Sequence, residues 1–212
     1  MRKILFHLIY PVILILITAC TGQASTPIVS PPDIKPAPQT PTPVVSQADL
    51  EKEEQAVYAS FVKGNPETIV IQKDTSTRWL LSSEDELKQR MDYIASGLPN
   101  ASNETLDNFF QRNRQSTQLA PDMQLGIHYI LVSADEFSAV MDRPNGWDAF
   151  HEKYSPLGYM QFSRVGFNDT VDQAIVYVGS IPGPMMGSGN YYLLEKKGGQ
   201  WSIREQVLAW VS

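Results

Sequence analysis

A run of prolines near the start of the chain limits where a folded domain can form. Seven prolines lie between Pro27 and Pro43, among Ser, Thr, Ala and Gln. Proline removes a backbone donor and fixes φ, so such a segment favours an extended, solvated chain over packed structure. We therefore expect residues 20–45 to serve as a linker and residues 46–212 to form one globular domain, which is the usual capacity of a 212-residue chain.

The residues before the linker have the three-part layout of an export signal, predicted over residues 1–19. Arg2 and Lys3 give a positive start, a largely apolar stretch follows, and small residues come directly before Cys20. Ile17-Thr18-Ala19-Cys20 resembles the bacterial lipobox. The resemblance implies cleavage before Cys20, a diacylglyceryl group on this cysteine, and attachment to a membrane of the cell envelope with the domain facing outward.

The alternative interpretation of the leader is an uncleaved transmembrane anchor. The apolar stretch from Ile4 to Ile17 is shorter than the roughly 20 residues that span a bilayer, and His7 and Pro11 interrupt it. Two or three acyl chains would hold the protein firmly, because each buried methylene adds about 0.8 kcal/mol.

Charge and cysteine content exclude several classes of function. The formal net charge is −6, and no basic stripe is present that could replace counterions along nucleic acid phosphates. Cys20 is the only cysteine, so the domain has neither a disulfide nor a four-cysteine zinc site. Nucleic acid is therefore not an expected partner, and no cofactor is expected.

The first part of the domain has the periodicity of short helices. Apolar residues recur at helical spacing after Ser46 and after Ser83, and a third helix is expected from Glu104 to Asn113. Two further short helices are predicted after Ser133 and after Gly146. Buried strands are predicted between them, at 68–72 and 127–132.

The second part reads as a series of strands. They are expected at 159–167, 174–179, 191–196 and 201–210, with turn residues between them, including a Gly/Pro-rich loop at 182–190. Sequential strands with short connections usually pair antiparallel. The predicted fold class is α+β, with the short N-terminal helices covering one face of a C-terminal meander of about four strands.

Two resemblances concern the domain itself. Tyr191 to Lys196, followed by Gly198, Gly199 and Trp201, is similar to the closing hairpin of nuclear transport factor two-like domains, which implies a cone-shaped fold with a pocket. A longer set of segments resembles a family of uncharacterised exported bacterial proteins, which implies no activity. These segments are Phe150-His151, Phe162 to Asn168, Ala174 to Gly179 and Tyr191 to Lys196.

The domain contains two histidines that could act as an acid or a base. His128 lies in a predicted strand and faces either a pocket or solvent. His151 precedes Glu152, but a helical zinc motif needs a second histidine at position 155, which is Ser155. We predict no metal site, and each histidine can equally be an ordinary structural residue.

Three further residues are candidates for binding. Met185 and Met186 lie in the predicted loop, where they could form an adaptable apolar contact or simply fold back over the core. Arg164 lies in the middle of a predicted strand. It would bind a carboxylate on a concave face of the sheet, and would be a solvated charge on the convex face.

Two functions from different classes follow from these observations. The first is a non-catalytic envelope lipoprotein that binds an unknown small molecule or an envelope protein, and it is favoured because every catalytic motif is incomplete. The second is a small hydrolase- or isomerase-like enzyme with an acid-base pair in a conical pocket, built on His128 or His151.

Overall fold

The structure is a computed structural model that describes residues 45–77, 83–155 and 157–212. The predicted signal peptide, the predicted lipidation at Cys20 and nearly all of the linker lie outside the described residues. The helices are α1 Gln47–Val62, α2 Glu84–Gly97, α3 Asn103–Arg112, α4 Ala134–Met141 and α5 Gly146–Lys153. The strands are β1 Ile69–Gln72, β2 Tyr129–Val132, β3 Tyr159–Phe162, β4 Gly166–Phe167, β5 Gln173–Gly183, β6 Met186–Lys197 and β7 Gln200–Val211.

Serine side chains begin four of the helices. Ser46, Ser83, Ser102 and Ser133 each accept a hydrogen bond from the backbone N–H three residues further on. Such a cap satisfies one of the backbone donors that the first helical turn leaves without a partner. The helix starts predicted at Ser46, Ser83 and Ser133 are therefore confirmed.

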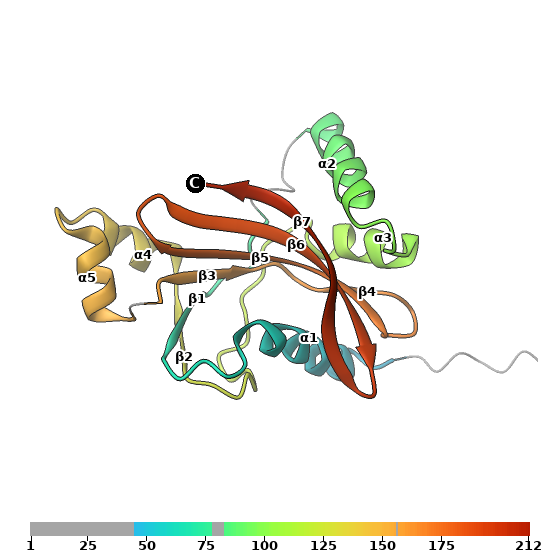
Figure 1. The fold of residues 1–212 in the computed structure, drawn as a ribbon, viewed down its shortest axis with the longest axis horizontal. Helices are drawn as coiled ribbons and strands as arrows, with labels where there is room; N and C mark the ends of the chain where they lie inside the picture. Colours follow the sequence, from blue (N-terminus) through green and yellow to red (C-terminus); the bar gives the residue numbers. More distant parts are fainter. Residues whose placement is uncertain (1–44, 78–82, 156) are drawn as a thin grey trace, which may run out of the picture. The chain divides into compact units, whose positions relative to one another are not determined.

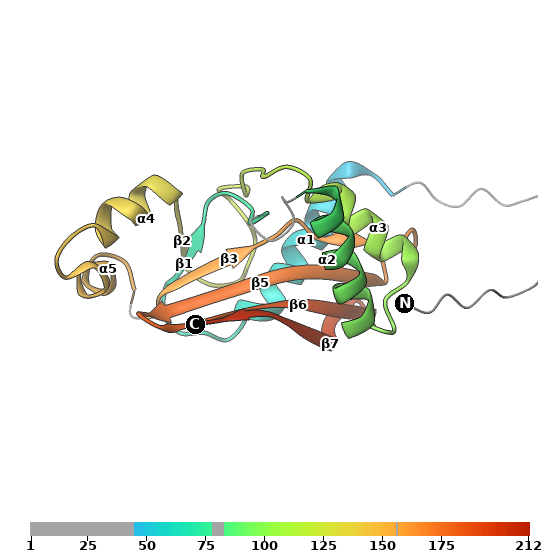
Figure 2. The ribbon, with the colours of Figure 1, turned by 90° about the horizontal axis from the view of Figure 1, so that it is seen from above.

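The strands form one open, mixed sheet of seven strands. Figure 2 shows six of them side by side in the order β2-β1-β3-β5-β6-β7, and β4 pairs with β5. The first part of this order is parallel, since β1 pairs in that sense with both β2 and β3. The remaining pairs are antiparallel. The α+β class and the antiparallel arrangement of the later strands, β3-β5-β6-β7, are confirmed. The sheet has seven strands where about four were expected, because the early strands join the same sheet through helical crossovers.

The strand predicted at 159–167 is interrupted between β3 and β4. The backbone N–H of Arg164 donates to Asn113 Oδ1, and that of Val165 donates to Glu54 Oε1, at distances of 2.9 and 2.8 Å. Side chains from two helices thus take donors that would otherwise join the sheet ladder. The chain bends at this point, and β4 pairs with β5 separately.

The prediction of a Gly/Pro-rich loop at 182–190 is also wrong. β5 continues to Gly183 and β6 begins at Met186, so that only Pro184 and Met185 form the turn. A side chain at Gly187 or Gly189 would collide with the indole of Trp210. These glycines allow Trp210 to lie against β6 and do not signal a loop.

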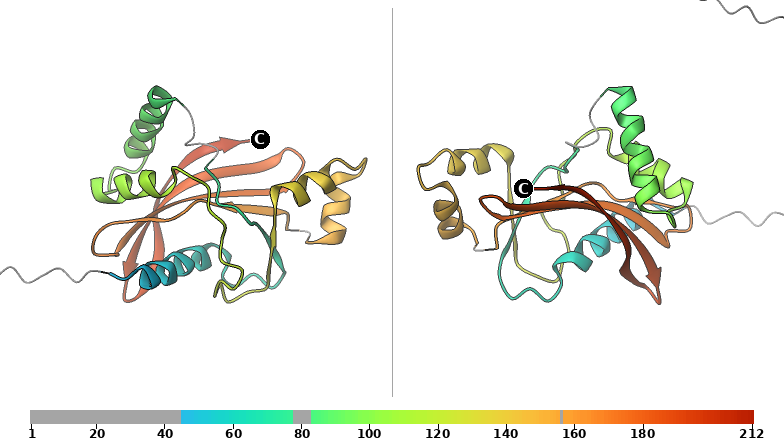
Figure 3. Two further views of the ribbon diagram at one scale, coloured as in Figure 1. Left: turned by 180° about the vertical axis from the view of Figure 1, so that it is seen from behind. Right: turned by 45° about the horizontal axis from the view of Figure 1, so that its top comes forward.

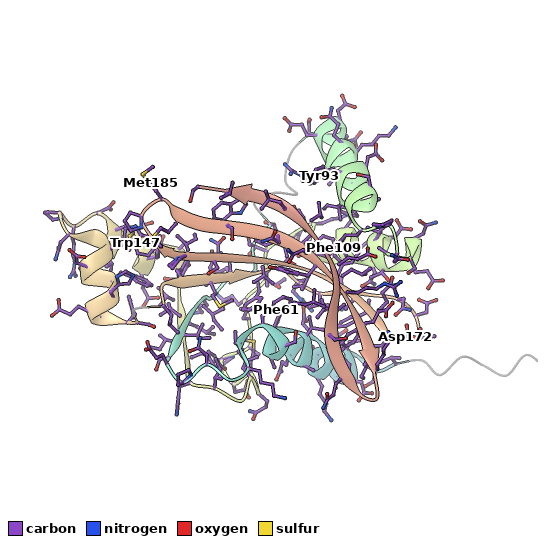
Figure 4. The ribbon with its side chains drawn as sticks, viewed as in Figure 1. Phe61, Tyr93, Phe109, Trp147, Asp172 and Met185 are labelled. Atoms are coloured by element: carbon purple, nitrogen blue, oxygen red, sulfur yellow. The ribbon has the colours of Figure 1, made fainter. Side chains whose placement is uncertain are left out.

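Helices cover both faces of the sheet, whereas the sequence suggested one. Val57 and Tyr58 of α1 pack with alternate residues of β5, such as Val176, on the first face. The intervening β5 residues, Ile175 and Tyr177, pack with α2 and α3 on the second face. Figure 1 shows α1 below the strands and α2 and α3 above them, and Figure 4 shows Phe61 and Phe109 on these opposite sides.

The second face carries another apolar cluster, at the end where β1 and β3 lie. Phe150 and Val140, from α5 and α4, pack there against Val70 and Tyr159. Figure 3 shows this helix pair apart from α2 and α3, at the other end of the sheet. The second face is thus covered at two separate places.

Candidate functional site

The side chain of Arg164, which the sequence suggested as a binding residue, forms an ion pair with another residue of the domain. Its Nε and Nη2 donate to the two carboxylate oxygens of Glu54, at 2.8 and 2.9 Å. Glu54 belongs to α1 and its residue is only 6% exposed. A bidentate arginine–carboxylate pair of this kind fixes geometry strongly. Arg164 therefore ties the bend between β3 and β4 to α1.

Glu54 is the centre of a larger buried network. It also accepts hydrogen bonds from Arg112 Nη2 and Tyr58 Oη, both at 3.0 Å, and from the backbone N–H of Val165 at 2.8 Å. One carboxylate thus receives five donors from α1, α3 and the β3–β4 bend. A residue with its lone pairs occupied in this way is suited to hold the fold together.

The network changes the protonation equilibria of its members. Burial raises the pKa of Tyr58 well above its ordinary value, and the charge of Glu54 adds to the effect. Burial lowers the pKa of Arg112. Burial acts in the same sense on Arg164, but the hydrogen bonds and charge of Glu54 outweigh it and raise the pKa.

A small cavity of about 230 Å³ lies beside this network. Its lining includes Glu54, Tyr58 and Arg164, whose polar groups are already engaged with one another. Glu51, Gln55 and Gln118 also line the cavity. We interpret this cavity as a by-product of the structural network.

The structure does not bring the two histidines together. His128 is exposed and directly precedes β2, where its carbonyl accepts from the Ile69 N–H at 3.1 Å. His151 lies on α5, and its Nε2 is 2.9 Å from the Pro182 carbonyl. Its ring also packs near that of Trp147. Of the cavities found among the described residues, those of about 230, 420 and 310 Å³ include neither histidine in their lining.

Met185 and Met186 lie at the turn between β5 and β6. They are 88% and 62% exposed, and Met185 projects away from the strands (Figure 4). Met185 has a φ of 53°, which is uncommon for a residue with a side chain. The methionines remain candidates for an apolar contact, and they lie at the tip of a tight turn, where the sequence suggested a long loop.

The larger cavity opens on the second face of the sheet and measures about 420 Å³. Its floor is made by β1, β3 and β5, and its walls by α4 and by two connecting segments. The lining residues are Gln72, Thr75, Ser76, Thr77, Ser116, Ala134, Phe137, Ser138, Tyr159, Gln161 and Ile181. This volume lies within the range of about 300–1,000 Å³ that is usual for small-molecule sites.

Backbone pairing fixes the segment that follows β1 as one wall of this cavity. The Thr75 N–H donates to the Thr117 carbonyl at 2.8 Å, and the Ser76 N–H donates to the Phe162 carbonyl at 2.7 Å. The Ser116 hydroxyl donates to the Thr75 carbonyl at 2.6 Å. The wall is thus held by β3 on one side and by the connection between α3 and β2 on the other.

Three side chains in the cavity keep hydroxyl groups that the described protein does not use. Ser76 and Thr77 are each 6% exposed and Tyr159 is 2% exposed. Their hydroxyls make no hydrogen bond to any other described residue, and none of them is sealed from solvent. The small exposed part of each residue therefore includes its hydroxyl oxygen.

Two glutamines on the cavity floor form an ordered pair. The Gln72 Nε2 donates to the Asp74 carbonyl at 2.8 Å, so its Oε1 must accept from Gln161 Nε2, which lies 2.7 Å away. The Gln161 Oε1 atom lies over Gly179 of β5, on the same side as Tyr177 Oη. The cavity thus offers a fixed acceptor beside hydroxyls that can donate or accept.

An aromatic wall completes the cavity. The rings of Phe137 and Tyr159 are stacked, with centroids 4.4 Å apart and an interplanar angle of 19°. Burial raises the pKa of Tyr159 far above its ordinary value, and the charges of Asp74 and Glu136 raise it further. Tyr159 is therefore neutral at physiological pH and acts as a hydrogen-bonding group.

Tyr159 is the only titratable side chain in the lining that the structure describes, and its pKa is raised far above neutral pH. None of the lining side chains that the structure describes is Asp, Glu, Lys, Arg or His. General acid-base catalysis near neutral pH needs a group whose pKa is close to the working pH. The cavity is therefore suited to binding by hydrogen bonds and apolar contact.

Sequence reasoning missed every residue of this cavity. Gln72 ends an apolar strand and Gln161 interrupts another, but their pairing depends on β1 and β3 being neighbours in register. The Thr75-Ser76-Thr77 run is the available signal, because three consecutive hydroxyl residues shortly after a buried strand suggest a polar surface.

Neither the described residues nor known proteins point to a further type of site. In the described ranges, no group of three or more His, Cys, Asp or Glu could hold a metal ion, and no helix is long and apolar enough to cross a membrane. No family model, no curated protein and no solved structure matches the chain.

Proposed function

We propose that the chain is a lipid-anchored protein of the cell envelope whose domain binds a small molecule without transforming it. The observation that carries the proposal is the cavity of about 420 Å³ between β1, β3, β5 and α4, with its free hydroxyls and, among the described residues, an uncharged lining. The lipobox-like Ile17 to Cys20 supports the anchor, and the proline-rich linker would hold the domain away from the bilayer.

An enzymatic function built on the histidines receives less support. His151 is engaged with the Pro182 carbonyl, and His128 is exposed at the start of β2. Neither lines the large cavity. An acid-base pair would have to converge with its substrate in one cleft.

We also propose that the open sheet has the cone-shaped architecture of nuclear transport factor two-like domains. The residues that carry the resemblance, Tyr191 to Lys196 with Gly198, Gly199 and Trp201, form the β6–β7 hairpin. An experimental structure whose sheet cannot be superposed on such a domain would contradict this part of the proposal.

Binding can be tested by a screen that measures the unfolding temperature of the full-length protein in mild detergent. A ligand present at a hundredfold excess over its Kd adds about 2.7 kcal/mol of stability, and each kcal/mol raises the Tm by about 2–4 °C for a chain of this size. The expected result is a set of small molecules that raise the unfolding temperature by several degrees.

A pair of variants on α4 locates the binding site. Ser138 is exposed and lines the cavity, whereas the neighbouring Ala139 is exposed and does not line it. Ser138→Trp should fill the mouth of the cavity and remove the stabilisation, and Ala139→Trp should leave it intact. A screen without stabilising compounds, or compounds that stabilise Ser138→Trp as well as the natural protein, would contradict the proposal.

A further inference from the structure

The charge balance of the large cavity selects among chemical classes of ligand. Its described lining contains no charged side chain, so a charged ligand would lose hydration there without gaining a counter-ion. Asp74 and Glu136 lie near enough to act on Tyr159, but neither belongs to the lining. Their negative charges oppose an anion in particular, and an ammonium group inside the cavity would find no direct partner.

The hydrogen-bonding groups of the cavity also restrict the chemical class of the ligand. The hydroxyls of Ser76, Thr77 and Tyr159 can donate or accept, whereas Gln161 Oε1 can only accept. A ligand rich in hydroxyls matches this set, because each of its groups can also take either role. A purely apolar ligand would leave the cavity groups without water or partners, and a carboxylate or phosphate would face Gln161 Oε1 acceptor to acceptor.

The apolar part of the lining makes a third selection. Ile181, Phe137 and Tyr159 make part of the lining apolar, and the faces of the two aromatic rings are stacked on each other. A sugar ring has the complementary character, with an apolar face of C–H bonds and a rim of hydroxyls.

We infer that the cavity binds a neutral saccharide, with Gln161, Ser76 and Thr77 holding the hydroxyls and the apolar lining at Phe137 and Ile181 contacting its C–H groups. This inference rests on the proposed binding function and adds the class of ligand. The saccharide can be a free sugar or a unit of a polymer, since the contacts with the cavity are the same.

Four sugars of the same ring size test the inference by isothermal titration of the full-length protein in detergent. Glucose and N-acetylglucosamine are neutral, glucosamine carries a positive charge and glucuronate carries a negative one. The neutral pair should bind at least about tenfold more tightly than the charged pair, because the charged groups find no counter-ion in the cavity.

Two variants separate the contribution of the cavity from general effects. Gln161→Glu changes one atom of the side chain and places a charge in the lining, so it should weaken the neutral sugars about tenfold and favour glucosamine over glucuronate. Ser138→Trp should abolish binding of all four sugars, and Ala139→Trp should behave as the natural protein. If Gln161→Glu fails to fold, the Ser138→Trp and Ala139→Trp pair still decides the question.

The source of the saccharide is tested with chitin and cellulose beads. Retention on the beads that Ser138→Trp abolishes indicates a polymeric ligand, and binding of the soluble sugars alone indicates a free one. Both outcomes support the inference. A third outcome is that the screen finds charged or apolar compounds whose binding Ser138→Trp blocks, while the neutral sugars and the beads do not bind. The inference of a saccharide ligand is then wrong, and the proposed binding function stands. If no compound, sugar or bead is sensitive to Ser138→Trp, both are overturned.

Discussion

Replacing Glu54 by glutamine keeps the shape of a buried side chain and removes the charge on which five hydrogen bonds converge. Glu54 accepts from both Arg164 and Arg112, from Tyr58 and from the Val165 backbone. A glutamine presents an NH₂ group at one of the two oxygen positions. At least one arginine would then face a donor, and both would lose their counter-ion.

The expected loss of stability follows from burial. Removing one partner of a buried ion pair costs about 3–5 kcal/mol. The side chains of Arg164 and Arg112 are 22% and 15% exposed, so water can partly solvate them after the change. We therefore expect the lower end, about 3 kcal/mol, which is a large fraction of the roughly 5–15 kcal/mol that holds a typical domain folded.

Urea unfolding of the full-length protein, followed by tryptophan fluorescence, measures this loss. With a slope of about 1–3 kcal/mol per molar urea, the midpoint should fall by at least about 1 M. Glu51→Gln is the control on the same helix, because Glu51 is exposed and, among the described residues, accepts a hydrogen bond only from Gln47. Its effect should stay within about 0.5 kcal/mol. A loss below about 1 kcal/mol for Glu54→Gln would refute the structural role assigned to the network.

Three other predictions concern packing, pH and the anchor. Gly166→Ala should destabilise the domain by about 1–3 kcal/mol in the same urea assay, because the new methyl group would collide with the backbone of Phe109 in α3; an unchanged midpoint would show that this close approach is absent. Stability should hold up to about pH 10 and fall above it, because burial raises the pKa of Tyr159 and of Tyr191 above the ordinary value of 10.0, so the unfolded chain loses these protons first. A urea midpoint that does not fall as the pH rises above about 10 would contradict this. Cys20→Ala should move the protein from the detergent phase to the aqueous phase in a detergent partition assay, whereas a variant that stays in the membrane would favour an uncleaved anchor.

Local features of the fold could be predicted from the sequence because their signals are local. Ser83 with Glu86 and Ser133 with Glu136 form the reciprocal caps that their spacing indicates. The β6–β7 hairpin turns at Gly198 and Gly199, both with positive φ, where the two glycines suggested a turn. In each case the deciding contacts lie within a few residues of one another.

The predictions from the sequence were wrong where contacts between residues far apart in the chain determine the local structure. Gly187 and Gly189 suggested a loop, but the absence of a side chain at these positions makes room for Trp210 of β7. Residues 159–167 suggested one strand, but Glu54 and Asn113 take the backbone donors at its centre. Neither of these contacts can be recognised from a pattern of neighbouring residues in the sequence.

The candidate site was beyond sequence reasoning for the same reason. Gln72 and Gln161 are 89 positions apart and form a pair only because β1 and β3 are parallel neighbours. Arg164 attracted attention as an isolated charge in a strand, and its partner Glu54 lies 110 positions away. A titratable residue is conspicuous in a sequence, whereas a neutral cavity built from Gln, Ser and Thr is not.

Hydrogen–deuterium exchange of the full-length protein, with and without a stabilising compound from the screen, tests most directly where a ligand binds. If the large cavity is the binding site, protection should appear at Thr75 to Thr77 and in α4, which form its walls. Protection confined to residues 118–123, which border the small cavity beside Glu54, would contradict the account.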